Sequence, residues 1–148
     1  MKCRLATPLD VERLVQIEQS QPMCAHWGEK GWQNEIKNPA AQIWCWEEDG
    51  EPVGFVAARL TAGFGEILNV AVLPTCTRKG IGFRLLARLL SQARLQGVEQ
   101  ISLEVNVRNV AAISLYSKAG FAEMGRRKKF YNEQDDALIM GKDLCAKD

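Results

Sequence analysis

The chain has 148 residues, 47% of them apolar, which is the size and composition of one folded domain with a substantial core. Nineteen basic residues nearly balance eighteen acidic ones, so the formal net charge of +1 gives no field that would attract nucleic acid or a membrane surface, and no apolar run reaches the roughly 18 residues of a membrane-spanning helix. The lack of a long apolar run predicts a cytoplasmic protein. Five cysteines, an odd number without close pairs, argue against a disulfide framework and against a zinc site, so we expect free thiols.

The N-terminal residues predict a strand followed by a helix. Residues 2–6 can form a short strand. The helix start is typical, with Thr7 as the cap, Pro8 in the first turn and Asp10 facing the helix dipole. The apolar spacing that follows predicts a helix that ends near Gln19.

An irregular connector comes next. Residues 20–31 lack periodicity and are rich in large side chains, so they form either a binding loop or a plug at the edge of the core. A short second helix is expected from about Trp32, and Pro39 stops it.

Three apolar runs then predict an antiparallel meander. Residues 42–48 and 53–60 flank a turn and form a hairpin, and residues 66–73 add a third strand. Trp44 and Trp46 lie two apart and share one face, where packing against a helix is expected.

A glycine-rich loop joins the third strand to a helix. Gly80 and Gly82 allow a tight turn and a close approach to a ligand, and apolar residues at three- and four-residue intervals predict a helix from Gly80 to Gly97. A helix N-terminus binds phosphate through its unpaired N–H groups, and Arg78 and Lys79 add positive charge beside it. The stretch therefore has the character of a pyrophosphate-binding loop.

Two familiar phosphate-binding motifs do not fit this loop. A P-loop requires Lys followed by Ser or Thr after the last glycine, where this chain has Phe83 and Arg84. A dinucleotide-binding loop requires a third glycine, where this chain has Leu85. A plain turn before a core helix remains the alternative to another kind of pyrophosphate site.

The remaining residues complete a mixed sheet. Residues 100–105 predict a strand, residues 110–118 a helix, and residues 122–131 and 137–143 the last two strands. The expected fold class is α/β (α+β), a seven-stranded, mostly antiparallel mixed sheet flanked by about four helices.

Two stretches resemble the signatures of the GNAT N-acetyltransferases. Residues 77–82 resemble their acetyl-CoA signature: both glycines match, but Thr77 departs from the usual Gln or Arg. Residues 104–121 resemble the second signature, with Glu-Val, a short loop, Asn, two small residues, Ile, Leu-Tyr and Gly-Phe. The element order also matches along nearly the whole chain. The resemblance implies a single GNAT domain over residues 1–148, with acetyl-CoA as cosubstrate and no metal.

The resemblance also implies roles for individual residues. Glu104 matches the general base and Tyr116 the general acid. By residue type alone, Glu104 could equally face solvent or pair with Arg108, and Tyr116 could be a core residue. Asn109 could also cap the helix that follows it. The residues implied to contact acetyl-CoA are Val70, Ala71, Val72, Arg78, Lys79, Gly80, Ile81, Gly82, Phe83 and Asn109.

Two further stretches resemble the RimI-type ribosomal-protein-alanine acetyltransferases within this superfamily: residues 26–30 and residues 126–140. This implies that the acceptor is a protein or peptide N-terminus, most directly the N-terminal alanine of a small-subunit ribosomal protein, with no nucleic-acid or membrane partner. Glu29 and Tyr131 are candidates for substrate contact.

Other functions stay open at this point. The acceptor could be a small-molecule amine or a lysine side chain. A non-catalytic acyl-CoA sensor is an alternative of another class, supported by Thr77 at the usual Gln or Arg position. The sequence also leaves open the oligomeric state and the role of the basic run 126–129.

Overall fold

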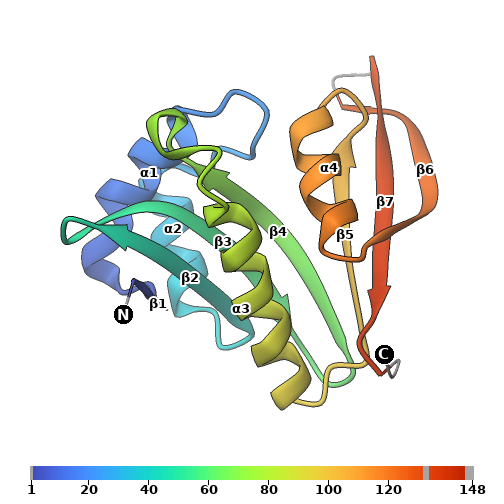
Figure 1. Cartoon of the computed structure of the whole chain (residues 1–148), viewed down its shortest axis with the longest axis horizontal. Coiled ribbons are helices and arrows are strands. Elements are labelled where there is room, and N and C mark those ends of the chain that lie inside the picture. Colours follow the sequence, from blue (N-terminus) through green and yellow to red (C-terminus); the bar gives the residue numbers. More distant parts are fainter. Residues whose placement is uncertain (1, 132–133, 146–148) are drawn as a thin grey trace.

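A seven-stranded mixed sheet organises the chain, as the sequence predicts. The computed structural model describes residues 2–131 and 134–145. The strand order is β1-β2-β3-β4-β5-β7-β6, and all neighbours are antiparallel except β4 and β5 (Figure 1). The strands are β1 Cys3–Leu5, β2 Ala41–Glu48, β3 Glu51–Leu60, β4 Phe64–Val72, β5 Gln100–Asn106, β6 Ala122–Tyr131 and β7 Asp135–Asp143.

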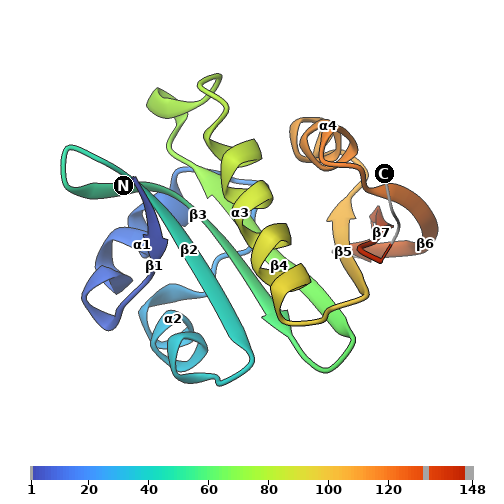
Figure 2. The ribbon, with the colours of Figure 1, turned by 60° about the horizontal axis from the view of Figure 1, so that its bottom comes forward.

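Helices cover both faces of this sheet. Helices α1 (Val11–Gln19) and α2 (Gly28–Lys37) lie under the β1–β4 half, while α3 (Ile81–Leu95) and α4 (Val110–Lys118) lie on the opposite face (Figure 2). Two short 3-10 turns, Pro8–Asp10 and Pro74–Cys76, precede α1 and α3. Helix α2 begins at Gly28, four residues before the predicted start.

Each face has its own apolar core. The α1–α2 core lies between these two helices and the sheet, and its fully buried side chains include Leu14, Ile17, Trp32 and Phe55. The core on the other face, the α3–α4 core, is built around the apolar stripe of α3. Trp44 and Trp46 belong to this second core, which confirms that they share a face packed against a helix.

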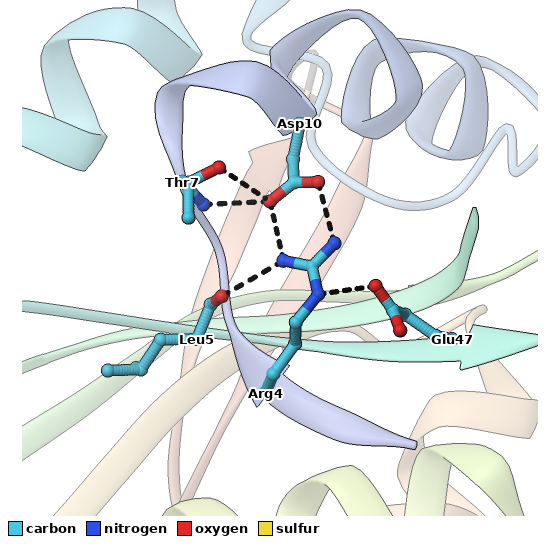
Figure 3. Close-up of polar contacts among 5 residues, drawn as sticks. All are labelled: Arg4, Leu5, Thr7, Asp10 and Glu47. Carbon is cyan, nitrogen blue, oxygen red and sulfur yellow. Dashed lines mark hydrogen bonds and ion pairs between the residues drawn. The ribbon is translucent and has the colours of Figure 1, made fainter. Parts of the chain in front are cut away.

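A polar network fixes the N-terminal strand to its neighbours (Figure 3). The guanidinium of Arg4 donates two hydrogen bonds to the Asp10 carboxylate, at 2.8 and 2.9 Å, and a third to Glu47 on β2. The Thr7 N–H also donates to Asp10. The hydrogen bonds from Arg4 hold the pKa of the Asp10 carboxyl below its usual value, so the carboxylate is charged at neutral pH.

The feature that positions the site is the divergence of β4 from β5. Their parallel pairing runs from Phe64 opposite Gln100 to Ile67 opposite Leu103, and beyond it the two strands separate (Figure 1). The β3–β4 register shifts where Ala57 pairs with Asn69 and Ala58 with Ile67, which leaves one extra residue in β4. Such a bulge bends a strand and increases its twist, so it accounts for the separation.

Candidate active site

Two hollows lie where β4 and β5 separate. One has a volume of about 610 Å³ and is lined by the connector before α2, by β4 and by the ends of β5 and α4. We call it the acceptor hollow. The other has a volume of about 900 Å³ and is lined by the glycine-rich loop, the first turn of α3 and one side of α4. We call it the cofactor hollow. Val70 and Ala112 line the first, and Val72 and Ala111 line the second.

The two glycines of the loop have different structural roles. Gly80 immediately precedes α3 with φ of 77°, a left-handed conformation that disfavours any residue with a Cβ. Gly82 lies where α3 approaches α4, since a Cβ there would lie 3.1 Å from Leu115 Cδ2. Gly80 therefore shapes the loop and Gly82 allows close helix packing. This packing role was not apparent from the sequence.

Four basic side chains line the cofactor hollow: Arg78, Lys79, Arg84 and Lys118. Lys79 Nζ also lies 3.4 Å from Glu48 Oε1. Thr77 turns its hydroxyl to the Pro74 carbonyl, at 2.9 Å, so this side chain is engaged within the loop.

Strand β4 directs alternate residues to different places. The Leu73 N–H donates to Val53 O on β3. Because pairing alternates along an antiparallel ladder, Ala71 also faces β3, while Val70 and Val72 turn their backbone groups toward the separated β5 side. The side chain of Ala71 packs in the α1–α2 core. The structure therefore brings Val70 and Val72 to the hollows but not Ala71, which the resemblance had included.

Glu104 lines the acceptor hollow and forms an ion pair. Its Oε1 lies 3.2 Å from Arg127 Nε, and about a quarter of its side chain is exposed. Arg108, the partner considered from the sequence, instead lies 3.7 Å from Asp135 Oδ1. Glu104 therefore pairs with Arg127 and not with Arg108, the alternative that residue type alone left open, because the order β5-β7-β6 brings β6 within reach of Glu104.

Tyr116 and Asn109 reach the same hollow from α4. Tyr116 is buried, packs against Phe121 with ring centroids 5.9 Å apart, and lines the hollow beside Glu104. Asn109 accepts a hydrogen bond from the Ala112 N–H at 3.3 Å, so it caps α4 while lining the hollow. The capping role considered for Asn109 is thus observed, and the structure places the residue in the lining of the acceptor hollow and not in that of the cofactor hollow.

The connector before α2 forms the far wall of the acceptor hollow, with Pro22, Met23, Cys24 and Ala25 in the lining. Asn69 is 4% exposed and donates from Nδ2 to the Ala25 carbonyl at 2.8 Å. Gln21 donates to the Val72 carbonyl at 2.7 Å. These two bonds attach the connector to β4. The sequence analysis missed both residues, although an asparagine inside the apolar β4 run was a usable signal.

A buried carboxylate fixes the other end of the connector. Glu18 is 1% exposed and accepts hydrogen bonds from the Trp27 and Gly28 N–H groups and from Trp32 Nε1, each at 2.9 Å. It thereby satisfies donors at the start of α2 and compensates its own burial.

Glu29 and Tyr131 are the two candidates for substrate contact. Glu29 is exposed in the first turn of α2, accepts from Gln33 Nε2 at 3.3 Å, and is not in the lining of either hollow. Tyr131 ends β6, where its backbone pairs with Asp135, and its side chain lies outside the described part of the structure. Phe83 and Ile81 are in the lining of the cofactor hollow.

Within the described residues, no cluster of His, Cys, Asp and Glu is arranged to hold a metal ion. All five cysteines are unbridged. Among the same residues, no helix combines the length and apolar character that spanning a bilayer requires.

Comparison with known proteins gives consistent results. The sequence profile of the acetyltransferase (GNAT) family matches residues 11–121. An N-alpha-acetyltransferase of Sulfurisphaera tokodaii is 34% identical over 122 residues, 74% of this chain and 73% of that protein. A ribosomal protein bS18-alanine N-acetyltransferase of Escherichia coli K12 is 34% identical over 96 residues, 63% of this chain and 65% of that protein. The crystal structure of the Escherichia coli ribosomal-protein-S18-alanine N-acetyltransferase superposes with a TM-score of 0.87 at 26% identity, covering 99% of this chain and 95% of that one. This superposition confirms the predicted fold.

Proposed function

The chain belongs to the GNAT family of acetyltransferases, and from that premise we propose that it transfers the acetyl group of acetyl-CoA to the N-terminal α-amine of a polypeptide. The observation that carries the proposal is the separation of β4 from β5, with one hollow on each side of residues 70–72. One hollow offers N–H groups and basic side chains, and the other offers a carboxylate and a phenol.

The cofactor hollow suits the acidic end of acetyl-CoA. The first turn of α3 provides N–H donors for the pyrophosphate, and Arg78, Arg84 and Lys118 add positive charge. The outward-facing N–H groups of Val70 and Val72 and the Val70 carbonyl are placed to pair with the amide-containing pantetheine arm, whereas the Val72 carbonyl accepts from Gln21. The thioester then lies at the junction of the two hollows.

In the proposed reaction the acceptor nitrogen attacks the thioester carbonyl carbon, and Glu104 takes the proton of the amine directly or through a water. A β4 N–H stabilises the oxyanion of the tetrahedral intermediate. When the C–S bond breaks, Tyr116 gives its proton to the departing thiolate. Exchange with solvent returns Glu104 to its charged form and Tyr116 to its neutral form.

A covalent acyl-cysteine route fits the geometry less well. Cys24 is the thiol in the acceptor-hollow lining, and burial together with the nearby Glu18 carboxylate raises its pKa to about 11. The nucleophilic thiolate is therefore scarce at neutral pH. Direct transfer from acetyl-CoA to the amine is the simpler reaction.

The acceptor class follows from relatives and from amine chemistry. The relatives are named as acting on N-terminal α-amines, one of them on the alanine of ribosomal protein bS18. At pH 7 an ordinary α-amine is roughly one tenth neutral, whereas a lysine amine is about 0.04% neutral. We propose a protein N-terminus beginning with alanine, of the ribosomal-protein kind, as the preferred acceptor.

A thiol-release assay with acetyl-CoA tests this function. Peptides with a free N-terminal alanine should be acetylated, and the same peptides with a blocked N-terminus and a free lysine should not. Equal rates on both would contradict the proposal, and acetyl-CoA binding without thiol release on any amine would favour the sensor alternative.

Two substitutions test the assigned chemistry. Glu104→Gln and Tyr116→Phe should each lower kcat by about 10²-fold or more, the range for loss of a general base or acid. Glu123→Gln is a matched control, because Glu123 lies on β6 outside the lining of both hollows. A Glu104→Gln enzyme with normal kcat would remove Glu104 from the mechanism.

A further inference from the structure

The ion pair between Glu104 and Arg127 crosses a whole strand. Glu104 is on β5 and Arg127 on β6, and β7 lies between them in the sheet. The register places Ala137 of β7 directly between Arg127 and Asn106, and Ile139 opposite Glu104. The arginine side chain therefore extends over β7 at Ala137 to bring Nε within 3.2 Å of Glu104 Oε1. A small residue at position 137 leaves room for this path.

Arg127 and its neighbour Arg126 face opposite sides of the sheet. Successive residues of a strand face opposite sides of the sheet. Arg126 pairs in register with Leu138, whose side chain belongs to the α3–α4 core, and its Nε lies 3.4 Å from Glu123 on the same strand. Arg127 pairs in register with Ala137 and faces the other side, where it meets Glu104 of the acceptor hollow. The run is thus divided into residues that face the site and residues that do not.

We propose that Arg127 is a positioning residue for the general base: it holds the Glu104 carboxylate in the orientation from which it takes the acceptor's proton. This inference rests on the proposed function. Arg127 Nε approaches Glu104 Oε1, and a carboxylate has two oxygens, so the guanidinium can hold one while the other addresses the hollow. A glutamate that is one quarter exposed would otherwise sample several rotamers, most of them unproductive.

The expected effect is moderate because both side chains are partly exposed. Loss of such a pair changes the population of the productive orientation by about fivefold, so Arg127→Gln should lower kcat about fivefold. The KM for acetyl-CoA should stay unchanged, since Arg127 is not in the lining of the cofactor hollow. Arg127→Lys, which keeps the charge, should recover part of the loss.

The decisive experiment is a double-mutant cycle with kcat, both KM values and the melting temperature measured for each variant. If Arg127 acts through Glu104, Arg127→Gln should have no further effect in a Glu104→Gln background. Arg126→Gln is the matched control, with the same charge removed from the adjacent residue, and should leave both KM values and kcat unchanged.

The possible outcomes separate this inference from the function on which it rests. A wild-type enzyme inactive on free N-termini overturns the proposed function and the inference with it. If the wild type is active, three results overturn only the positioning role. The first is an equal loss from Arg127→Gln in both backgrounds, and the second is a kcat that Arg127→Gln leaves unchanged or raises. The third is the same loss from Arg126→Gln.

Discussion

The attachment of the connector to β4 makes a testable claim about acceptor binding. Asn69→Leu keeps the number and branching of the side-chain heavy atoms but removes the Nδ2 donor that holds the Ala25 carbonyl at 2.8 Å. The connector residues 22–25 form a wall of the acceptor hollow and contribute nothing to the cofactor hollow. We therefore expect the substitution to weaken acceptor binding specifically.

The size of the effect follows from the environment of the bond. A neutral hydrogen bond contributes about 0.5 to 1.5 kcal/mol net, and more when the abandoned partner stays buried. Ala25 is exposed, so its carbonyl can bind water once the connector loosens, and the lower part of this range applies. A loss of about 1 kcal/mol in the ordered connector should raise the acceptor KM by up to about fivefold, because only the ordered form binds and the apparent affinity scales with its population.

Initial rates measured while each substrate is varied in turn distinguish the two hollows. The acceptor KM of Asn69→Leu should rise while the acetyl-CoA KM stays within about twofold. Asn38→Ala is a matched control, since it removes a loop hydrogen bond of 2.9 Å to the Ala40 N–H in the turn before β2. An equal or larger rise in the acetyl-CoA KM would refute the reasoning, as would an unchanged acceptor KM in a folded protein.

Three further substitutions address the cofactor hollow and the stability of the fold. Gly82→Ala places a Cβ 3.1 Å from Leu115, so steady-state rates should show a raised acetyl-CoA KM at an unchanged acceptor KM; the reverse pattern would contradict the packing role. Thr77→Gln should increase the affinity for acetyl-CoA about twofold in a calorimetric titration, because the longer amide can reach a phosphate, whereas the threonine hydroxyl is bonded to the Pro74 carbonyl. A lower affinity would contradict the phosphate-binding role of this loop. Asp10→Asn should lower the free energy of unfolding by about 2 kcal/mol at pH 7, by loss of charge-assisted bonds to Arg4. Because the pKa of Asp10 is lowered in the folded protein, its contribution is present above the usual carboxyl pKa and is lost as the pH falls through the lowered one, so urea denaturation should show the two proteins converging in acid; a constant difference down to acid would refute this.

The sequence predicts the fold well where the signals are local. The three- and four-residue spacing gave α3, and the Asn-capped segment gave α4 with the observed bounds Val110–Lys118. The start of α2 was missed because residues 28–31 include two glycines and no apolar periodicity. The groups that stabilise it there come from Glu18, ten residues earlier, and from burial of Trp32. A helix start that depends on a distant carboxylate leaves little trace in a local pattern.

The residues of the candidate site also differ in whether a local motif marks them. The glycines of the loop, Glu104 and Tyr116 lie in contiguous motifs and could be recognised from the sequence. Arg127 could not be assigned to Glu104, because that pairing depends on the order β5-β7-β6, in which the last strand of the chain lies between two strands that follow one another in the sequence. Glu18 was detectable in principle, since it continues the apolar stripe of α1 through Leu14, and a charged residue in such a stripe requires partners.

The bulge in β4 connects these observations. Ile67 and Ala71 are four residues apart and would share a face in a regular strand, but Ile67 packs in the α3–α4 core and Ala71 in the α1–α2 core. The extra residue between the Ala58 and Ala57 pairings reverses the alternation at this point. With the alternation reversed, Asn69 points to the connector, and Val70 and Val72 turn their backbone groups to the gap. One inserted residue therefore sets both the separation of β4 from β5 and the orientation of the side chain that fixes the acceptor wall, so the acceptor and cofactor hollows are built by the same irregularity.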